Sequence, residues 1–191
     1  IDKNYVVAAS GILENNNAIG YGYQDDPLID QKHKGRKLTW HFVNEKAHDF
    51  MWAGDPDYIH QIAQVPNGPK LHFFYQQGQA TRHWEKLPEI IIAAFQYMNT
   101  HFGAYPFSDF YVIQGGDGGM EYPMSTLITG NRDLSSLVGV TVHEALHSWY
   151  QGVLATNESY YHWMDEGYTS YASSLTMSHL MGTDNKRSHA K

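Results

Sequence analysis

The feature that most constrains this chain is the run His143-Glu144-Ala145-Leu146-His147. On a helix, residues four positions apart lie on the same face, about 6 Å apart along the axis. Two imidazoles placed in this way can bind one metal ion, and a carboxylate beside them can accept a proton from water. The run therefore favours a metal-binding helix. Five residues alone leave open a pair of solvated histidines on an ordinary amphipathic helix.

The residues around this run predict a helix over about 137–151, ended by Gly152. An apolar stripe with helical spacing lies away from both histidines and comprises Val138, Val142, Ala145, Leu146 and Trp149. We expect this stripe to pack into the core while the histidines face a cleft.

A third candidate ligand is Glu166, which follows His147 after eighteen intervening residues. It lies in the first turn of a second predicted helix, over about 163–181, where the helix dipole favours a carboxylate. Taken alone, it is best interpreted as a helix-start charge. Together with the two histidines, it predicts a site for one Zn²⁺ ion, because zinc accepts imidazole and carboxylate ligands. The preceding Asp165 has the chemistry to orient a ligand histidine, but we expect it to be a helix-start charge.

The combination of His-Glu-x-x-His with a glutamate after eighteen residues resembles the gluzincin zinc metallopeptidases. The chain from about Phe50 onward is similar to their aminopeptidase-N family, which also contains the bifunctional leukotriene hydrolase. The further motifs that carry this resemblance are Phe102-Gly103-Ala104-Tyr105-Pro106, Gly118-Gly119-Met120-Glu121-Tyr122-Pro123, His147-Ser148-Trp149 and Trp163-x-x-Glu166-Gly167-Tyr168.

The resemblance implies a role for each motif residue. These are zinc ligation by His143, His147 and Glu166, general base catalysis by Glu144, and substrate binding by Gly118, Gly119, Met120 and Glu121. Glu121 would hold the free α-amine, which suits an enzyme that removes only the first residue of a peptide. The glycines would let the substrate backbone approach closely, although a plain turn is an alternative. The sequence departs from the family at Tyr122 and Asp165, where the family often has Asn.

The pattern outside the motifs predicts an α+β fold. It predicts a helix from Pro88 to the glycine at 103, and strands at 5–9, 38–43, 71–75, 110–113 and 127–129. The resemblance implies two parts. Residues 1–48 would end an all-β sandwich domain, and residues 49–191 would begin a truncated thermolysin-like catalytic domain with a small mixed sheet plus helices.

Composition excludes several other classes of protein. The chain has no Cys, which excludes thiolate metal sites, a Cys nucleophile and disulfides. Its net charge of −7 argues against a nucleic-acid binder, and no apolar run approaches the ~20 residues of a membrane span. Because the sequence starts at Ile1 without Met, we expect a piece of a longer protein. We expect its polar tail, 183–191, to be poorly ordered.

The function predicted from the sequence is zinc-dependent hydrolysis of the N-terminal bond of peptides with a free N-terminus. One alternative is a gluzincin endopeptidase or another hydrolase, in which Glu121 is only structural. Another is a non-catalytic zinc-binding fragment that binds peptides, although the intact Glu144 argues against it. The family stabilises the oxyanion with a Tyr well beyond the third ligand, and we assign that role to no Tyr of this chain.

Overall fold

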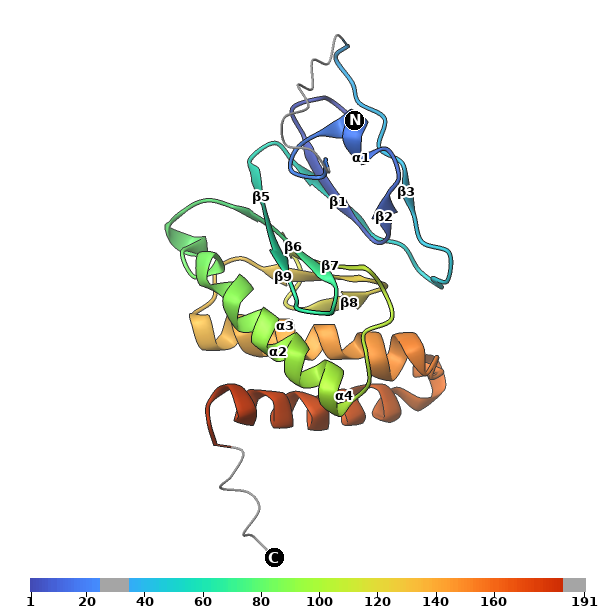
Figure 1. Ribbon diagram of the computed structural model, residues 1–191, viewed down its shortest axis with the longest axis vertical. Coiled ribbons are helices and arrows are strands. Elements are labelled where there is room, and N and C mark those ends of the chain that lie inside the picture. The colour runs from blue at the N-terminus through green and yellow to red at the C-terminus, as the bar shows by residue number, and fades with distance from the viewer. Residues whose placement is uncertain (25–34, 184–191) are drawn as a thin grey trace, which may run out of the picture.

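The computed structural model describes residues 1–24 and 35–183 (Figure 1). Its strands are β1 (Val6–Ala9), β2 (Ile12–Leu13), β3 (Phe42–Val43), β4 (Trp52–Asp55), β5 (Tyr58–Gln64), β6 (Lys70–Gln76), β7 (Asp109–Gly115), β8 (Met120–Tyr122) and β9 (Ser125–Thr129). Its α-helices are α1 (Asn16–Ile19), α2 (Leu87–His101), α3 (Leu134–His147) and α4 (Glu158–Leu180). Short 3₁₀ turns at Gln79–Thr81 and Trp84–Lys86 precede α2. The tail that we expect to be poorly ordered lies outside the described residues from residue 184 onward.

The central sheet has five strands in the order β5-β6-β7-β9-β8. Strands β6, β7 and β9 run parallel, while β5 and β8 pair antiparallel at the two edges. The connection from β6 to β7 passes through α2, as parallel neighbours require. The predicted α+β class with a small mixed sheet and helices is therefore confirmed.

Both faces of the central strands are buried, because successive side chains point to opposite sides. On β6, Leu71 and Phe73 pack with the helices, whereas Phe74 packs with the N-terminal segment. On β7, Val112 faces the helices and Tyr111 faces the N-terminal segment. The sheet thus separates two hydrophobic clusters.

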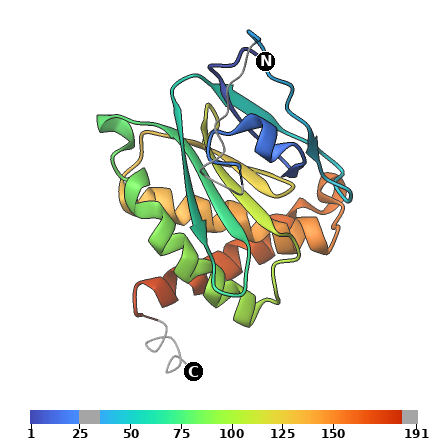
Figure 2. The same cartoon turned by 45° about the horizontal axis from the view of Figure 1, so that its top comes forward.

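One face of the sheet is covered by helices. Helix α2 buries Ile91, Phe95 and Met98, and α3 contacts both α2 and α4. Helix α4 lies on the side of this pair away from the sheet (Figures 1 and 2). None of the helices in the described ranges has the length and apolar character that crossing a membrane requires.

The opposite face is covered by the N-terminal layer, which we define as β1 to β4 with α1 (Figure 2). Strand β1 pairs with β4, and β2 pairs with β3, both antiparallel. The strand predicted over 38–43 is shorter than expected, because only Phe42 and Val43 find ladder partners, on β2. Strands β2, β4, β5 and β8 were not predicted. The division at residues 48 and 49 stays a prediction.

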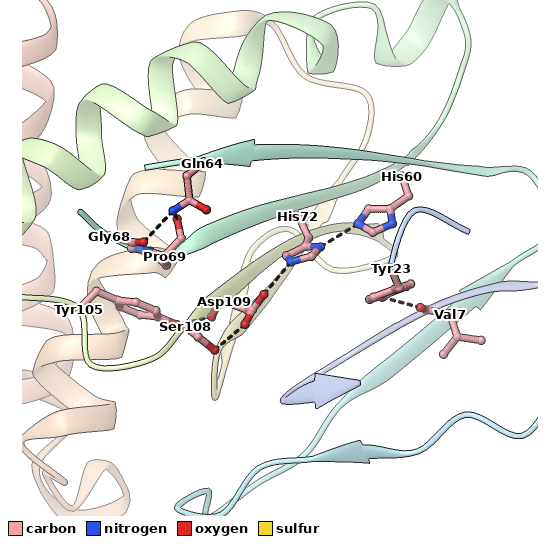
Figure 3. Close-up of polar contacts among 10 residues, drawn as sticks. All are labelled: Val7, Tyr23, His60, Gln64, Gly68, Pro69, His72, Tyr105, Ser108 and Asp109. Atoms are coloured by element: carbon pink, nitrogen blue, oxygen red, sulfur yellow. Dashed lines mark hydrogen bonds and ion pairs between the residues drawn. The ribbon is translucent and has the colours of Figure 1, made fainter. Parts of the chain in front are cut away.

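A chain of polar side chains crosses the sheet beneath this layer (Figure 3). His60 Nε2 lies 2.8 Å from His72 Nδ1, and His72 Nε2 lies 2.9 Å from Asp109 Oδ1. At the other end, His60 Nδ1 lies 2.8 Å from the carbonyl oxygen of Tyr21. The Tyr23 hydroxyl donates to the carbonyl oxygen of Val7 at 2.7 Å. The contact between His60 and Tyr21 thus joins the N-terminal segment to a polar chain that runs through three strands of the sheet.

Candidate metal centre

Helix α3 carries the His-Glu-x-x-His run. It begins after Asp133, whose side chain accepts a hydrogen bond from the Ser136 backbone N–H at 2.9 Å and so caps the first turn. The predicted apolar stripe is confirmed, with all its members buried against the sheet and α2: Val138, Val142, Ala145, Leu146 and Trp149. The sequence predicts that this helix extends to residue 151. In the structure the α-helix ends at His147, and the chain continues as a π-helix over Ser148–Val153, which has more residues per turn.

The two histidines of the run face each other. Their Nε2 atoms lie 3.3 Å apart, and their ring planes are almost perpendicular, at 86°. His147 is buried, with 1% of its surface exposed, whereas His143 is half-buried. Burial lowers the pKa of His143, and the neighbouring His147 adds to this effect. Both effects favour the neutral imidazole, which is the form that binds a metal.

Glu166 approaches the same point from α4. Its Oε2 atom lies 3.3 Å from Nε2 of His143, and its Oε1 atom lies 3.9 Å from Nε2 of His147. Ligands of a tetrahedral zinc ion at 2.0–2.1 Å are about 3.3 Å apart. Two of the three separations have this value and the third, between Glu166 and His147, is longer at 3.9 Å. The chemistry of the donors and their closeness therefore fit a zinc ion.

Asp165 contacts the far side of one of these histidines. Its Oδ1 atom lies 2.6 Å from Nδ1 of His147, and only 3% of the residue is exposed. A carboxylate accepts the proton of Nδ1, which leaves the Nε2 lone pair directed at the candidate site. The expectation that Asp165 is a helix-start charge is therefore wrong. Its position next to a candidate ligand was the signal that favoured this contact.

Helix α4 begins at Glu158 but is interrupted by a kink at Tyr161, where φ is −132° and ψ is 45°. The helical stretch that carries Asp165 and Glu166 therefore begins after Tyr161, close to the predicted residue 163. Asp165 lies near the start of this stretch, but its carboxylate is buried against His147. Packing of α4 against α3 brings both carboxylates to the histidines.

Glu144 lies beside this cluster and is itself buried, with 6% of its surface exposed. Burial raises the pKa of its carboxyl group to about 8, and the nearby negative charge of Glu121 adds to the shift. Carboxylate oxygens of Glu121 and Glu144 and a ring nitrogen of His147 all lie within 4.8 Å of one another. The structure thus brings together both carboxyl groups that the sequence singled out.

Strand β8 places Glu121 there. It pairs with β9 at the sheet edge, with Glu121 opposite Thr126. The preceding Gly119 packs directly on α3, since a Cβ atom built on it would lie 2.4 Å from Oε1 of Glu144 and 2.6 Å from a methyl group of Val140. Close approach of β8 to α3 therefore requires a glycine at this position, a reason that the sequence pattern did not reveal.

The remaining residues of the substrate-binding run are more open. Met120 is 39% exposed, and nothing but the Arg132 side chain lies within 4 Å of a Cβ atom built on Gly118. A small hollow of about 20 Å³ is lined by Glu121 and His147 among others. It shares lining residues, including Met124, with a larger cavity of about 560 Å³ between the N-terminal layer and the segment after α3.

Comparison with known proteins finds similarity over a short part of the chain. No protein-family model matches it. A stretch of 60 residues is 50% identical to "Leucine aminopeptidase 2" of Lodderomyces elongisporus and covers 28% of this chain and 9% of that protein. A stretch of 71 residues is 41% identical to "Aminopeptidase B" of Rattus norvegicus and of Homo sapiens, and covers 34% of this chain and 10% of each.

All of these relatives are named as aminopeptidases, and the chain matches about a tenth of their length. The similarity supports a relationship to aminopeptidases at this coarse level.

Proposed function

We propose that the chain carries the catalytic centre of a zinc-dependent aminopeptidase of the aminopeptidase-N type. The observation that carries this proposal is the convergence of donor atoms from His143, His147 and Glu166, with two further carboxyl groups beside them. The names of the relatives support a peptidase. The proposal extends to the fold, as the first part of a thermolysin-like domain behind the last strands of a β-sandwich.

His143, His147 and Glu166 would hold one zinc ion, because two imidazoles and one carboxylate leave one tetrahedral position for water or substrate. When bound, zinc polarises the scissile carbonyl and lowers the pKa of water towards neutrality. Asp165 keeps His147 in the tautomer that directs Nε2 inward.

Glu144 would move the proton. Its carboxylate takes a proton from the water molecule that attacks the scissile carbonyl carbon, and returns it to the leaving amine when the C–N bond breaks. Its burial excludes bulk water, so that the proton is not lost to solvent between the two transfers. The position next to His143 on the helix keeps this carboxyl group beside the candidate metal ligands.

Glu121 would set the point of cleavage. An anion at a fixed distance from the reacting carbonyl pairs with the α-ammonium of the first residue and rejects a chain that continues past it. The closeness of Glu121 to Glu144 and His147, with donor atoms within 4.8 Å of one another, supports this role. Gly118 leaves room for the substrate backbone beside β8.

The test compares an aminoacyl anilide with its N-acetylated counterpart, on the longest natural polypeptide that contains this sequence. We expect cleavage of the free amine and little cleavage of the acetylated substrate. Equal cleavage of both would contradict the aminopeptidase and favour an endopeptidase or another hydrolase. Zinc binding without any cleavage would favour a peptide-binding protein.

A substitution at Glu144 tests its role as the general base. Glu144→Gln keeps the size of the side chain but cannot accept the proton, so we expect turnover to fall at least about a hundredfold with zinc still bound. Zinc content measured by atomic absorption is the control. Retained activity would refute the role of Glu144.

A further inference from the structure

Arg132 lies in the turn between β9 and α3, and its guanidinium group binds three segments at once. Nε donates to the Thr129 hydroxyl at 3.0 Å, and Nη1 donates to the Ser136 hydroxyl at 3.0 Å. Nη2 donates to the carbonyl oxygen of Gly118. The side chain thus joins the end of β9, the first turn of α3 and the glycine-rich loop before β8.

Apart from the packing of Gly119 on α3, this loop, residues 116–119, depends on Arg132 for its position. Within residues 1–24 and 35–183, Arg132 is the only side chain that donates a hydrogen bond to its backbone. Strand β8 follows at once, has only three residues, and pairs on one side only, at the sheet edge. A three-residue edge strand does not fix the position of its own leading loop, since few ladder hydrogen bonds anchor it.

The position of this loop determines how β8 packs against Glu144, the proposed base. Gly119 lies against the carboxyl group of Glu144, and Glu121 follows two residues later. A shift of Gly118 therefore changes the separation of the two carboxyl groups. Arginine suits this task because its donors point in fixed, different directions, whereas a lysine ammonium is a compact charge on a flexible stem.

We propose that Arg132 is a positioning residue that holds the loop at 116–119, and through it Glu121, at the distance from Glu144 that binding of a substrate α-ammonium requires. This inference rests on the proposed function. The guanidinium acts through the Gly118 carbonyl and is not one of the candidate zinc ligands. Its positive charge also lowers the pKa of the nearby Glu144, against the larger effect of burial, which raises that pKa.

The test measures KM and kcat for the aminoacyl anilide in Arg132→Ala and Arg132→Lys. We expect KM to rise about tenfold to a hundredfold in Arg132→Ala, with kcat within about threefold of the wild type. The rise should be smaller in Arg132→Lys, which keeps the positive charge and one donor nitrogen. Arg82→Ala is the matched control. Within residues 1–24 and 35–183, the guanidinium group of Arg82 donates a hydrogen bond only to the exposed carbonyl oxygen of Gln79. We expect it to match the wild type.

A second measurement uses no substrate. Amide hydrogen exchange at residues 116–121 should be faster in Arg132→Ala than in the wild type or Arg82→Ala. A fall in kcat at constant KM would overturn the proposal, because it would show that Arg132 acts through the charge of Glu144 or through the folded fraction and not through Glu121. Unchanged KM and exchange would also overturn it. If the wild type cleaves no aminoacyl anilide, the proposed function fails. If it does and Arg132→Ala behaves like it, only the role of Arg132 fails.

Discussion

The imidazole of His147 is fixed from the side away from the candidate metal centre. Asp165 contacts Nδ1 at 2.6 Å, and the Thr169 hydroxyl lies 3.3 Å from the same atom. Both partners are buried. A ring held in this way has one orientation and one tautomer before any metal arrives, so that binding orders little of the side chain.

Removing this support should weaken zinc binding. We expect Asp165→Ala to lower zinc affinity about 10- to 100-fold and Asp165→Asn to lower it less, because the amide oxygen still accepts the Nδ1 proton. Competition with a chromophoric chelator measures the affinity. The exposed Asp57→Asn is the control for a lost carboxylate. Wild-type affinity in Asp165→Ala would contradict the orienting role.

Gly119 provides a second prediction at this scale. In Gly119→Ala the new methyl group meets Glu144 and Val140 at 2.4 and 2.6 Å, so that β8 must move away from α3. We expect the free energy of unfolding to fall by about 1–3 kcal/mol, with loss of cleavage. Gly116→Ala is the matched control, since nothing lies within 4 Å of its Cβ position. Urea denaturation measures the free energy of unfolding of the two variants. Equal stability would show that β8 tolerates the methyl group.

At the scale of the element, the His60–His72–Asp109 chain makes the pairing of β5, β6 and β7 sensitive to pH. Burial lowers the pKa of His60 to about 3, and the neighbouring His72 adds to this shift. Burial also lowers the pKa of His72. Burial opposes ionisation of Asp109, yet hydrogen bonds from His72 and Ser108 lower the pKa of its carboxyl group overall.

The sign of the resulting stability change follows from proton uptake. The unfolded chain binds a proton at His60 near pH 6.5, whereas the folded chain binds it only near pH 3. The stability that this neutral histidine contributes is therefore complete above pH 6.5 and is lost as the pH falls towards 3. Since one pKa unit corresponds to about 1.4 kcal/mol, the loss amounts to a few kcal/mol at most.

We expect the urea midpoint of the wild type to fall between pH 6.5 and 4. In His60→Gln the midpoint should be lower at pH 7 but should fall less with acid. His41→Gln, whose side chain is 63% exposed, should keep the wild-type slope. Measurements in a metal chelator keep the candidate metal centre empty in all three proteins. An unchanged pH slope in His60→Gln would contradict this assignment.

The elements that the sequence predicted well are those whose own residues carry a periodic pattern. Helix α2 shows the apolar spacing of a buried face, β7 has a continuous apolar centre, and β6 is apolar at its centre apart from His72. Strand β5 escaped prediction because it mixes polar residues such as His60 and Gln61 with apolar ones and is nowhere fully buried. Strand β8 owes its existence to pairing with β9, which no local pattern encodes.

At the scale of the whole molecule, the candidate metal centre joins α3 to α4. Zinc at a hundredfold excess over its Kd should add about 2.7 kcal/mol to the free energy of unfolding. We expect zinc to raise Tm, a chelator to reverse the rise, and His143→Ala to abolish it. His101→Ala, on the exposed side of α2, should respond like the wild type. Equal stabilisation of His143→Ala would place the ion elsewhere.

The candidate ligands could be predicted from the sequence because His143 and His147 share a helix face and their spacing is local. Glu166 could be predicted only in combination with the two histidines, since no periodic signal spans the segment between α3 and α4. The contact between Asp165 and His147 was the less favoured of two interpretations of the sequence, and the packing of Gly119 on Glu144 was not predicted. Both depend on how separate elements pack.

The split origin of the candidate ligands has a consequence for biogenesis. Two of the donors belong to α3 and the third to α4, and the π-helix at Ser148–Val153 lies between them in the chain. A nascent polypeptide that has made α3 but not yet docked α4 has only two of the three donors. Under the proposed function, only molecules in which α4 has docked on α3 would bind zinc through all three ligands. The fraction of molecules that contain zinc would then equal the fraction in which these two helices have docked.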